Sequence, residues 1–256
     1  MVDLHCHILP GIDDGPENME ISMAMAESAI ADGITHVVAT PHSSNEYPFD
    51  YRRVRDLRDE LQAKIGARLL LATGCDFHLN PENLADLRED PPRFCINQKD
   101  YLLVEFSEYS IPPSMDQTLH EIQLMGIRPI ITHPERNRIL RQHTERLAKW
   151  VRLGCSVQVT AGSLSGVFGT GAQKDVWRWM ADGLVHFVAS DAHNTGRRPL
   201  KLKSTYELIR EKCGEEKAHA LLADNPMAAF EGRTLPYVPE QGEGGDIPRR
   251  KRFYFF

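Results

Sequence analysis

Two histidines, His5 and His7, flank a cysteine directly after a short apolar segment near the start of the chain. Side chains alternate along a β-strand with a period of two, so on a strand both imidazoles point to one face and can bind one metal ion. Two aspartates, Asp13 and Asp14, follow in the next segment. The same pattern also fits a solvent-exposed strand edge, so the other ligand-type residues must decide between the two interpretations.

Residues of the same chemical types occur where later apolar segments end. They are His42, Asp76, Glu105, His133, Asp191 and His193. If the apolar segments are parallel strands, their carboxyl ends share one face, which is where the active sites of βα barrels lie. Six of seven predicted strands would then contribute a histidine or a carboxylate to one place. The sequence therefore predicts a polynuclear metal site.

The donor set of this predicted site comprises five imidazoles and several carboxylates. It favours zinc, iron or manganese over the all-oxygen environment of calcium or magnesium. Such ions lower the pKa of bound water and polarise a phosphoryl or acyl oxygen, so hydrolysis is the expected reaction class. The cysteines offer no alternative nucleophile, because none is followed six positions later by the arginine of a cysteine-dependent phosphatase loop.

The remaining histidines serve as an internal comparison. Five of them lie at the starts of predicted strands, opposite the expected site, or fall in helical segments, and we expect structural or surface roles for them: His36, His120, His143, His186 and His219. His78 lies two residues after Asp76 on the same strand face, so contact with the metals stays open for this residue.

Two arginines lie in the loops that follow predicted ligands, Arg136 after His133 and Arg198 after His193. Guanidinium groups bind phosphate oxygens with paired hydrogen bonds and stabilise the negative charge that develops there. Each arginine alone could instead be solvated or pair with a carboxylate, but together with the metal ligands they favour a phosphomonoester over an amide. The loop 160–169 would offer backbone N–H groups to phosphate or shape the rim of the site.

A repeated pattern indicates the elements that position these residues. Five amphipathic segments each end in a glycine and run at once into an apolar stretch, which predicts a helix, a left-handed glycine cap and a strand. These junctions lie at 31–40, 64–73, 124–132, 152–160 and 181–190. With two further apolar runs they give seven predicted strands, at about 2–8, 35–40, 68–75, 101–106, 128–132, 156–160 and 185–190. The expected fold is an α/β barrel, closed or nearly closed, with an open doubly wound sheet as the structural alternative.

Composition limits the partners and the compartment. The net charge of −6 includes four clustered cations, at Arg249, Arg250, Lys251 and Arg252. The rest of the chain therefore carries about −10, which argues against a nucleic-acid surface. No stretch approaches the length of a membrane span. An apolar strand that starts at Val2 leaves no room for a signal peptide, and the five cysteines lack a paired pattern, so a cytoplasmic protein is expected.

After Tyr237 the sequence becomes rich in proline, glycine and glutamate and loses its hydrophobic period. This change predicts two parts: a catalytic domain at 1–237, and a flexible linker with a tail at 238–256. The tail ends in PRRKRFYFF, 248–256, where four cations lie beside four aromatic residues. This composition favours peripheral contact with an anionic membrane or docking onto a partner, and it also fits a solvated end. Deletion of 248–256 is expected to reduce liposome association without slowing turnover of a free phosphopeptide.

Several motifs together resemble one known superfamily. They are HCHILPGIDDG at 5–15, ATPH at 39–42, VEF at 104–106, THPERN at 132–137 and ASDAHN at 189–194. In order and spacing they are similar to the polymerase and histidinol phosphatase (PHP) superfamily, and within it to the manganese-dependent tyrosine-protein phosphatases of bacterial capsule and exopolysaccharide operons. The resemblance covers nearly the whole chain. It implies a distorted seven-stranded (β/α)7 barrel, similar to a TIM barrel, with three metal ions.

The resemblance also implies the ligands of each metal: His5, His7 and Asp191 for the first, Glu105 and His133 for the second, Asp14, His42 and His193 for the third, and Asp76 as the bridge between the first two. The family pattern has glutamate at the bridging position. Aspartate is shorter by one methylene, so we expect either a strand shift or weaker binding of one metal. Asp13 would be free to cap the helix near Pro16.

The activity implied is removal of phosphate from the tyrosines of a bacterial tyrosine kinase tail or its substrates, with Arg136 and Arg198 stabilising the phosphoryl oxygens. Manganese is the first choice of metal, with iron, zinc or magnesium as alternatives. A phosphatase for histidinol phosphate or a sugar phosphate is the alternative enzyme, and a non-catalytic phosphotyrosine-binding regulator is the alternative outside catalysis. An amidohydrolase would usually carry a modified lysine where Glu105 stands.

Overall fold

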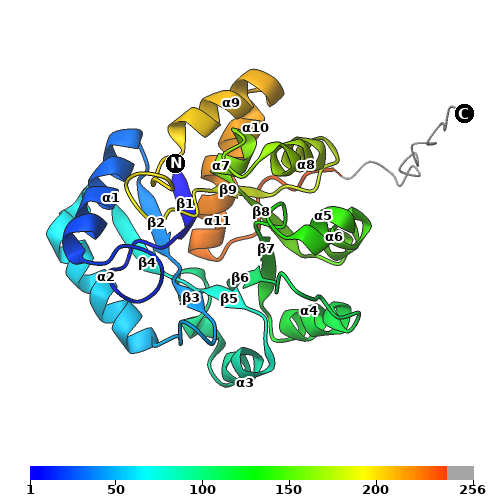
Figure 1. The fold of residues 1–256 in the computed structure, drawn as a ribbon, viewed down its shortest axis with the longest axis horizontal. Coiled ribbons are helices and arrows are strands. Elements are labelled where there is room, and N and C mark those ends of the chain that lie inside the picture. The colour runs from blue at the N-terminus through cyan, green and yellow to red at the C-terminus, as the bar shows by residue number, and fades with distance from the viewer. Residues whose placement is uncertain (241–256) are drawn as a thin grey trace, which may run out of the picture.

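The computed structural model describes residues 1–240; the basic and aromatic segment 248–256 lies outside the described residues. Parallel strands lie at the centre and helices surround them (Figure 1). The strands are β1 (Val2–Cys6), β2 (His36–Ala39), β3 (His42–Ser43), β4 (Leu70–Thr73), β5 (Asp76–His78), β6 (Tyr101–Glu105), β7 (Arg128–Thr132), β8 (Ser156–Thr160) and β9 (Phe187–Ala189).

The prediction of a parallel α/β fold is confirmed, whereas the count of seven strands in one barrel is not. The described residues form two sheets, in the orders β1-β2-β4 and β3-β5-β6-β7-β8-β9, rather than one closed sheet. The predicted strands at 35–40 and 68–75 each contain one strand, β2 or β4, and each is followed by a short strand that was not predicted, β3 or β5. Pro41 separates β2 from β3, because it has no N–H for a ladder hydrogen bond. Gly74 lies between β4 and β5, where a Cβ would approach Val38 Cγ1 to 2.9 Å.

The strand β1 also contacts the segment that follows β9. Cys6 and Ala192 form an isolated parallel bridge, and the His7 N–H donates to the Ala192 carbonyl at 2.8 Å. The Asp191 N–H donates to the His5 carbonyl at 2.9 Å. These bonds bring the first and last strand ends together, so the predicted ligands near both ends of the sequence share one location.

Eleven α-helices cover the strands in the described part of the chain. They are α1 (Met19–Asp32), α2 (Tyr51–Ile65), α3 (Pro81–Glu89), α4 (Met115–Leu124), α5 (Arg138–Gln142), α6 (Thr144–Arg152), α7 (Ala161–Leu164), α8 (Thr170–Ala181), α9 (Lys203–Cys213), α10 (Glu215–His219) and α11 (Asn225–Glu231). The five predicted junction glycines all have positive φ: Gly33, Gly66, Gly126, Gly154 and Gly183. Within residues 1–240, no helix combines the length and apolarity that a bilayer crossing requires.

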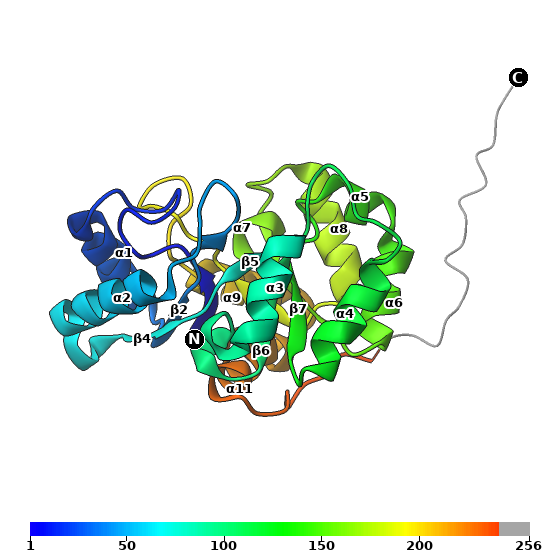
Figure 2. The ribbon, with the colours of Figure 1, turned by 90° about the horizontal axis from the view of Figure 1, so that it is seen from below.

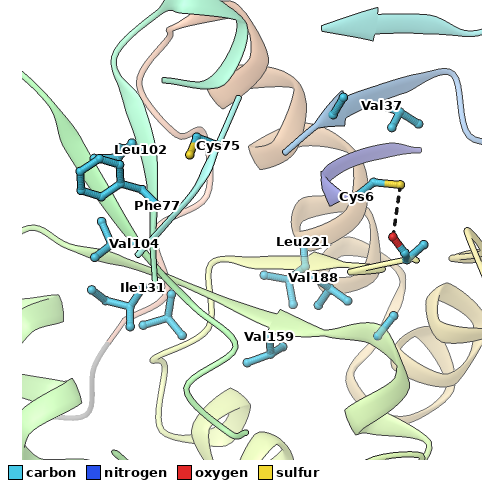
Figure 3. Close-up of a cluster of buried hydrophobic side chains, with 14 of the residues drawn as sticks. Cys6, Val37, Cys75, Phe77, Leu102, Val104, Ile131, Val159, Val188 and Leu221 are labelled. Carbon is cyan, nitrogen blue, oxygen red and sulfur yellow. Dashed lines mark hydrogen bonds between the residues drawn. The ribbon is translucent and has the colours of Figure 1, made fainter. Parts of the chain in front are cut away.

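Apolar side chains on the strands form two layers. One layer packs outward against the helices and includes Cys6, Phe77 and Val159 (Figure 3). The inner layer consists of Val2, Leu4, Val38, Ala72, Ile96, Tyr101, Leu103, Ile130, Phe187 and Ala229. Ala229 belongs to α11, which lies at the end of the molecule opposite the long loops (Figure 2).

The period of the strands explains why polar groups lie above this inner layer. On β6, Tyr101 and Leu103 point inward, and Glu105 follows on the same face. On β7, Ile130 points inward and Thr132 follows in the same way. The interior is therefore apolar near α11 and polar at the carboxyl ends of the strands.

Candidate metal centre

All nine predicted ligands come together at the carboxyl ends of the strands. They form four overlapping groups in which the ligand atoms lie within 4.8 Å of one another: His7, Asp14, His42 and His193; His5, His7 and Asp76; His5, His133 and Asp191; and His42, Asp76 and Glu105. The prediction that these residues converge on one site rested on their positions in the sequence, and the fold places them there.

Strand ends and the loops after them position these side chains. His5 lies in β1, and Asp76 begins β5. Two ligands in the loops have backbone φ in the left-handed region, His133 at 31° and Asp191 at 51°. This conformation is unfavourable for residues with a Cβ, and such strain is concentrated at functional sites. The backbone is therefore held in position for these two side chains.

Asp76 occupies the middle of the cluster. Its Oδ2 lies 3.3 Å from His42 Nδ1, 3.5 Å from His5 Nε2 and 3.7 Å from His133 Nε2. Two ligands of one ion with bonds of about 2.1 Å are themselves about 3 to 3.5 Å apart, so this spacing suits shared coordination. The same Oδ2 is fully buried and has no hydrogen-bond partner. A buried, unpartnered carboxylate oxygen among imidazoles is satisfied by a metal ion, so the residues fit the implied cofactor.

The third ligand set implied by the resemblance is present as a group. Asp14 Oδ1 lies 3.2 Å from His193 Nε2 and 3.4 Å from His42 Nε2. His7 belongs to this group as well, and its Nε2 also lies 3.5 Å from Asp191 Oδ1. The groups therefore overlap and do not divide into three separate sets.

The remaining implied contacts are also short. His5 Nε2 lies 3.5 Å from Asp191 Oδ1, and His133 Nε2 lies 3.8 Å from Glu105 Oε1. His78 Nδ1 lies 3.6 Å from the other oxygen, Glu105 Oε2, but His78 belongs to none of the four groups. It is therefore a neighbour of a candidate ligand rather than a candidate itself.

Electrostatics within the cluster are dominated by the facing acids and imidazoles. Burial alone would raise the pKa values of Asp76 and Asp191, but the neighbouring His5 helps to hold both below the ordinary value. Burial would lower the pKa of His5, yet these two carboxylates raise it to about 9. Burial would likewise lower the pKa of His42, yet the facing carboxylates of Asp14 and Asp76 raise it to about 11. A metal ion bound here would compete with protons for these imidazoles.

Two residues that the sequence did not predict as supports of the ligands orient the first histidine pair. Asp13 Oδ2 lies 2.7 Å from His7 Nδ1, which leaves Nε2 of that ring facing the cluster. Burial and the adjacent His193 lower the pKa of His7 to about 4, against the opposing charge of Asp13. Gln158 Oε1 lies 3.0 Å from His5 Nδ1 in the same way. Such partners fix the ring orientation of ligand histidines.

The expectation that Asp13 caps a helix is wrong. The helix α1 begins at Met19, and Asn18 caps it by accepting a hydrogen bond from the Ile21 N–H. Asp13 instead accepts from the backbone N–H groups of Gly15 and His42. Asp13 therefore links the loop between β1 and α1 to the segment that carries His42.

Both predicted arginines contact a ligand. Arg136 Nη1 and Arg198 Nη2 both bind Asp191 Oδ2, while Oδ1 of that aspartate faces the histidines. Phe168 supports them, with its ring centre 4.7 Å from Arg136 Cζ and 6.0 Å from Arg198 Cζ. The loop 160–169 thus contributes an aromatic side chain beneath the guanidinium groups.

A further buried carboxylate lies behind this pair. Glu135 is fully buried, and its Oε1 accepts from the Thr160 N–H at 2.8 Å and the Ser163 hydroxyl at 2.7 Å. These bonds join the loop that carries Arg136 to the end of β8 and to α7. Glu135 was missed because its partners lie far along the chain.

The comparison histidines lie outside the four groups. His186 is buried before β9, whereas His143 and His219 are exposed side chains on the helical layer.

The cysteines are not candidates for a nucleophile at this site. All five cysteines are free, and burial raises the pKa values of Cys6 and Cys75 well above the ordinary value.

Comparison with known proteins gives a consistent result. The model of a family described as capsular polysaccharide synthesis, CpsB/CapC, matches residues 1–231. The tyrosine-protein phosphatase YwqE of Bacillus subtilis is 34% identical over 100% of both chains. The tyrosine-protein phosphatase CpsB of Streptococcus pneumoniae is 30% identical, over 88% of this chain and 96% of its own.

Solved structures agree with the sequence comparison. One from a study of YwqE of Bacillus subtilis and CpsB of Streptococcus pneumoniae, described as metal-dependent tyrosine phosphatases, has a TM-score of 0.86 and 33% identity, and the match covers 95% of this chain and 100% of that one. A β-aspartyl dipeptidase of Fervidobacterium islandicum has a TM-score of 0.61 at 16% identity, covering 90% of this chain and 74% of its own. The second match reflects the fold alone.

Proposed function

Because the chain belongs to the CpsB/CapC family of capsular polysaccharide synthesis, we propose that it is a metal-dependent protein-tyrosine phosphatase that regulates capsular or extracellular polysaccharide synthesis. The observation that carries this proposal is the convergence of nine histidines and carboxylates around the unpartnered oxygen of Asp76. The full-length similarity to named tyrosine-protein phosphatases supports the choice of reaction.

We propose three metal ions, with manganese as the first choice and iron, zinc or magnesium as alternatives. Asp14, His42 and His193 would hold one ion, and the remaining candidate ligands would hold two more: His5, His7, Asp76, Glu105, His133 and Asp191. Bound ions of this kind supply a nucleophile from water at neutral pH and polarise phosphoryl oxygens. Aspartate at position 76 reaches three imidazoles, which supports its role as the bridge.

The arginines would bind the phosphoryl group. Arg136 and Arg198 each carry five N–H donors, and Asp191 uses only part of this capacity. Both side chains are mostly buried but retain an exposed fraction, 27% and 19%. Their free donors would stabilise charge on the phosphoryl oxygens in a region where water screens poorly. Phe168 would keep both guanidinium planes in place.

The leaving group places little demand on the protein. A tyrosine phenolate has a pKa of about 10 and departs more readily than an alkoxide, so a strong general acid is not needed.

The shape of the site also favours a tyrosine on a protein surface. The cleft between Glu105, His133 and Arg136 holds about 20 Å³, whereas pockets that enclose small ligands hold roughly 300 to 1,000 Å³.

The substrate we propose is phosphotyrosine on a bacterial tyrosine kinase or on its substrates. The alternatives are a phosphatase for histidinol phosphate or a sugar phosphate, and a regulator that binds phosphotyrosine without hydrolysis. The open candidate ligand Asp14, which is 44% exposed, favours a substrate that approaches from outside over one enclosed in a pocket. A cytoplasmic location, peripheral membrane contact and the division at residue 237 stay predictions.

Metal analysis combined with turnover tests this function. Purified protein is expected to contain manganese or a related ion and to hydrolyse a phosphotyrosine peptide faster than histidinol phosphate. His42→Ala should lower both metal content and turnover, by at least about tenfold for turnover, since it removes a ligand. His143→Ala is the matched control, because this exposed histidine lies outside the groups. Metal-free protein, or equal activity in the two variants, contradicts the proposal.

A further inference from the structure

A second cleft lies beside His42, away from Arg136 and Arg198. Its apolar walls include Pro41, Pro48 and Phe49, and Arg53 lines its rim. The cleft holds about 90 Å³. This volume is enough for a small polar group such as a carboxylate. Because His42 belongs to two of the ligand groups, an occupant of this cleft would lie next to the reacting phosphate.

Arg53 is the free cation of this cleft. Its side chain is exposed and forms no ion pair within residues 1–240. Its Nη2 donates to the Gly11 carbonyl at 2.6 Å, which holds the guanidinium against the loop that carries Asp14. Asp50 also lines the cleft, but its Oδ1 accepts from the backbone N–H groups of residues 52 and 53 as the cap of α2, and it forms no ion pair with Arg53 in the described part of the chain. Most of the Arg53 donors are therefore available to a ligand.

Further unpaired arginines lie in the loops of the same face. Arg138 begins α5 after His133, and Arg197 follows His193; both are exposed and form no ion pair in the described part of the chain. Some arginines on the helical flanks are instead paired, as Arg68 is with Glu27. The loops of this face also carry the exposed acids Glu17, Glu46 and Glu108, so the positive charge is confined to the surroundings of the three arginines. An acidic side chain is attracted where it approaches one of them.

We propose that the cleft beside His42 binds an acidic side chain adjacent to the phosphotyrosine of the substrate, with Arg53 as the residue that selects it. This inference rests on the proposed function. The apolar walls of Pro41, Pro48 and Phe49 exclude water from the carboxylate, which strengthens its pairing with Arg53. Arg138 and Arg197 offer further contacts to acidic residues of the same substrate.

Two phosphotyrosine peptides test this assignment, one with aspartate or glutamate on both sides of the tyrosine and one with asparagine or glutamine there. For the wild type, kcat/KM is expected to be about tenfold higher for the acidic peptide, the size of one hydrogen bond to a charged group. In Arg53→Ala the ratio of kcat/KM for the acidic peptide to kcat/KM for the amide peptide should fall to near one. The change should appear as a higher KM for the acidic peptide. Arg53→Lys should keep part of the preference, because lysine keeps the positive charge but not the paired N–H donors of the guanidinium group.

Arg152→Ala is the matched control. Arg152 is also exposed, but it ends α6 and lines a cleft with Tyr101 and Arg128 at the opposite ends of the strands, so the acidic preference should be unchanged. Wild type that hydrolyses both peptides with equal kcat/KM overturns this inference and leaves the phosphatase proposal intact. So does an unchanged ratio in Arg53→Ala. Wild type that hydrolyses neither peptide overturns the proposed function and this inference with it.

Discussion

Asp76 stands where the family resemblance predicts a longer bridging glutamate. The resemblance to the family led us to expect that aspartate would need a strand shift to bridge two metals. In the structure Asp76 begins β5, its Oδ2 lies within 3.7 Å of three imidazole nitrogens, and its Oδ1 lies 3.4 Å from the Thr132 hydroxyl. The short strand after the break at Gly74 brings the shorter side chain close enough. Bridging by Asp76 is therefore sterically compatible with this fold.

Asp13 offers a test at the same scale. Asp13→Asn keeps the size of the side chain but removes the charge that orients His7. We expect metal affinity to fall about 10- to 100-fold, which is typical for loss of a partner that orients a ligand histidine. Titration of metal-free protein with manganese, followed by calorimetry, measures the change. Affinity equal to that of the wild type would show that Asp13 serves the loop backbone alone.

The sequence identified the candidate ligands but not the residues that support them. Candidate ligands have a visible signal, since histidines and carboxylates recur where apolar segments end. The contact of Gln158 with His5 joins residues far apart in the sequence, and so do the contacts of Glu135 with Ser163 and of Phe168 with the arginines. Nothing local distinguishes a glutamine or phenylalanine with such a role from any other. Only the fold brings these pairs together.

At the scale of elements, the loop between β1 and α1 depends on one glycine. A Cβ at Gly15 would lie 2.6 Å from the carbonyl oxygen of His7 and 3.1 Å from its Cβ. The Gly15 N–H also donates to Asp13 Oδ1 at 3.0 Å. The backbone therefore passes so close to the first ligand pair that no side chain fits.

Gly15→Ala is expected to displace this loop. The clash is with backbone, which yields at a cost of about 1 to 3 kcal/mol in unfolding free energy. Because the loop carries Asp14, metal content should fall along with stability, and urea denaturation with metal analysis measures both. Gly196→Ala is the control, since a Cβ there approaches only Asn194 Oδ1, at 3.8 Å. Equal metal content in the two variants would contradict the expected displacement.

Element boundaries were predictable only in part. Each of the seven predicted strands contains observed strand, and the five junction glycines adopt the expected positive φ. The short strands β3 and β5 were not predicted, because neither contains an apolar run. Hydrophobic periodicity reports burial, whereas strand continuity depends on backbone donors and on close packing.

At the scale of the whole molecule, one buried histidine far from the metal centre makes stability depend on pH. His186 is buried just before β9, at the end of the strands opposite the metal centre, with Nδ1 lying 3.0 Å from the Leu184 carbonyl oxygen and 3.2 Å from the Val157 nitrogen. Burial lowers its pKa from 6.5 to about 4, although the Leu184 carbonyl opposes the shift. Between these pH values the unfolded chain binds a proton that the folded chain does not, so stability falls as pH falls.

The contribution of His186 to this loss is on the order of 3 kcal/mol between pH 6.5 and 4. His186→Gln removes the titrating group, so its unfolding free energy should fall less over the same range. Denaturation curves for both proteins at several pH values isolate the residue by difference, because the histidines of the metal centre are common to both. Parallel curves would assign the acid sensitivity elsewhere.

The nine candidate ligands lie at the carboxyl ends of the strands, and the apolar inner layer and α11 lie at the opposite end of the interior. A phosphotyrosine substrate would therefore approach from the carboxyl-end face, and free inorganic phosphate would bind the same arginines and metal centre. Free phosphate should act as a competitive product inhibitor, and a noncompetitive pattern in steady-state kinetics would indicate that phosphate binds elsewhere.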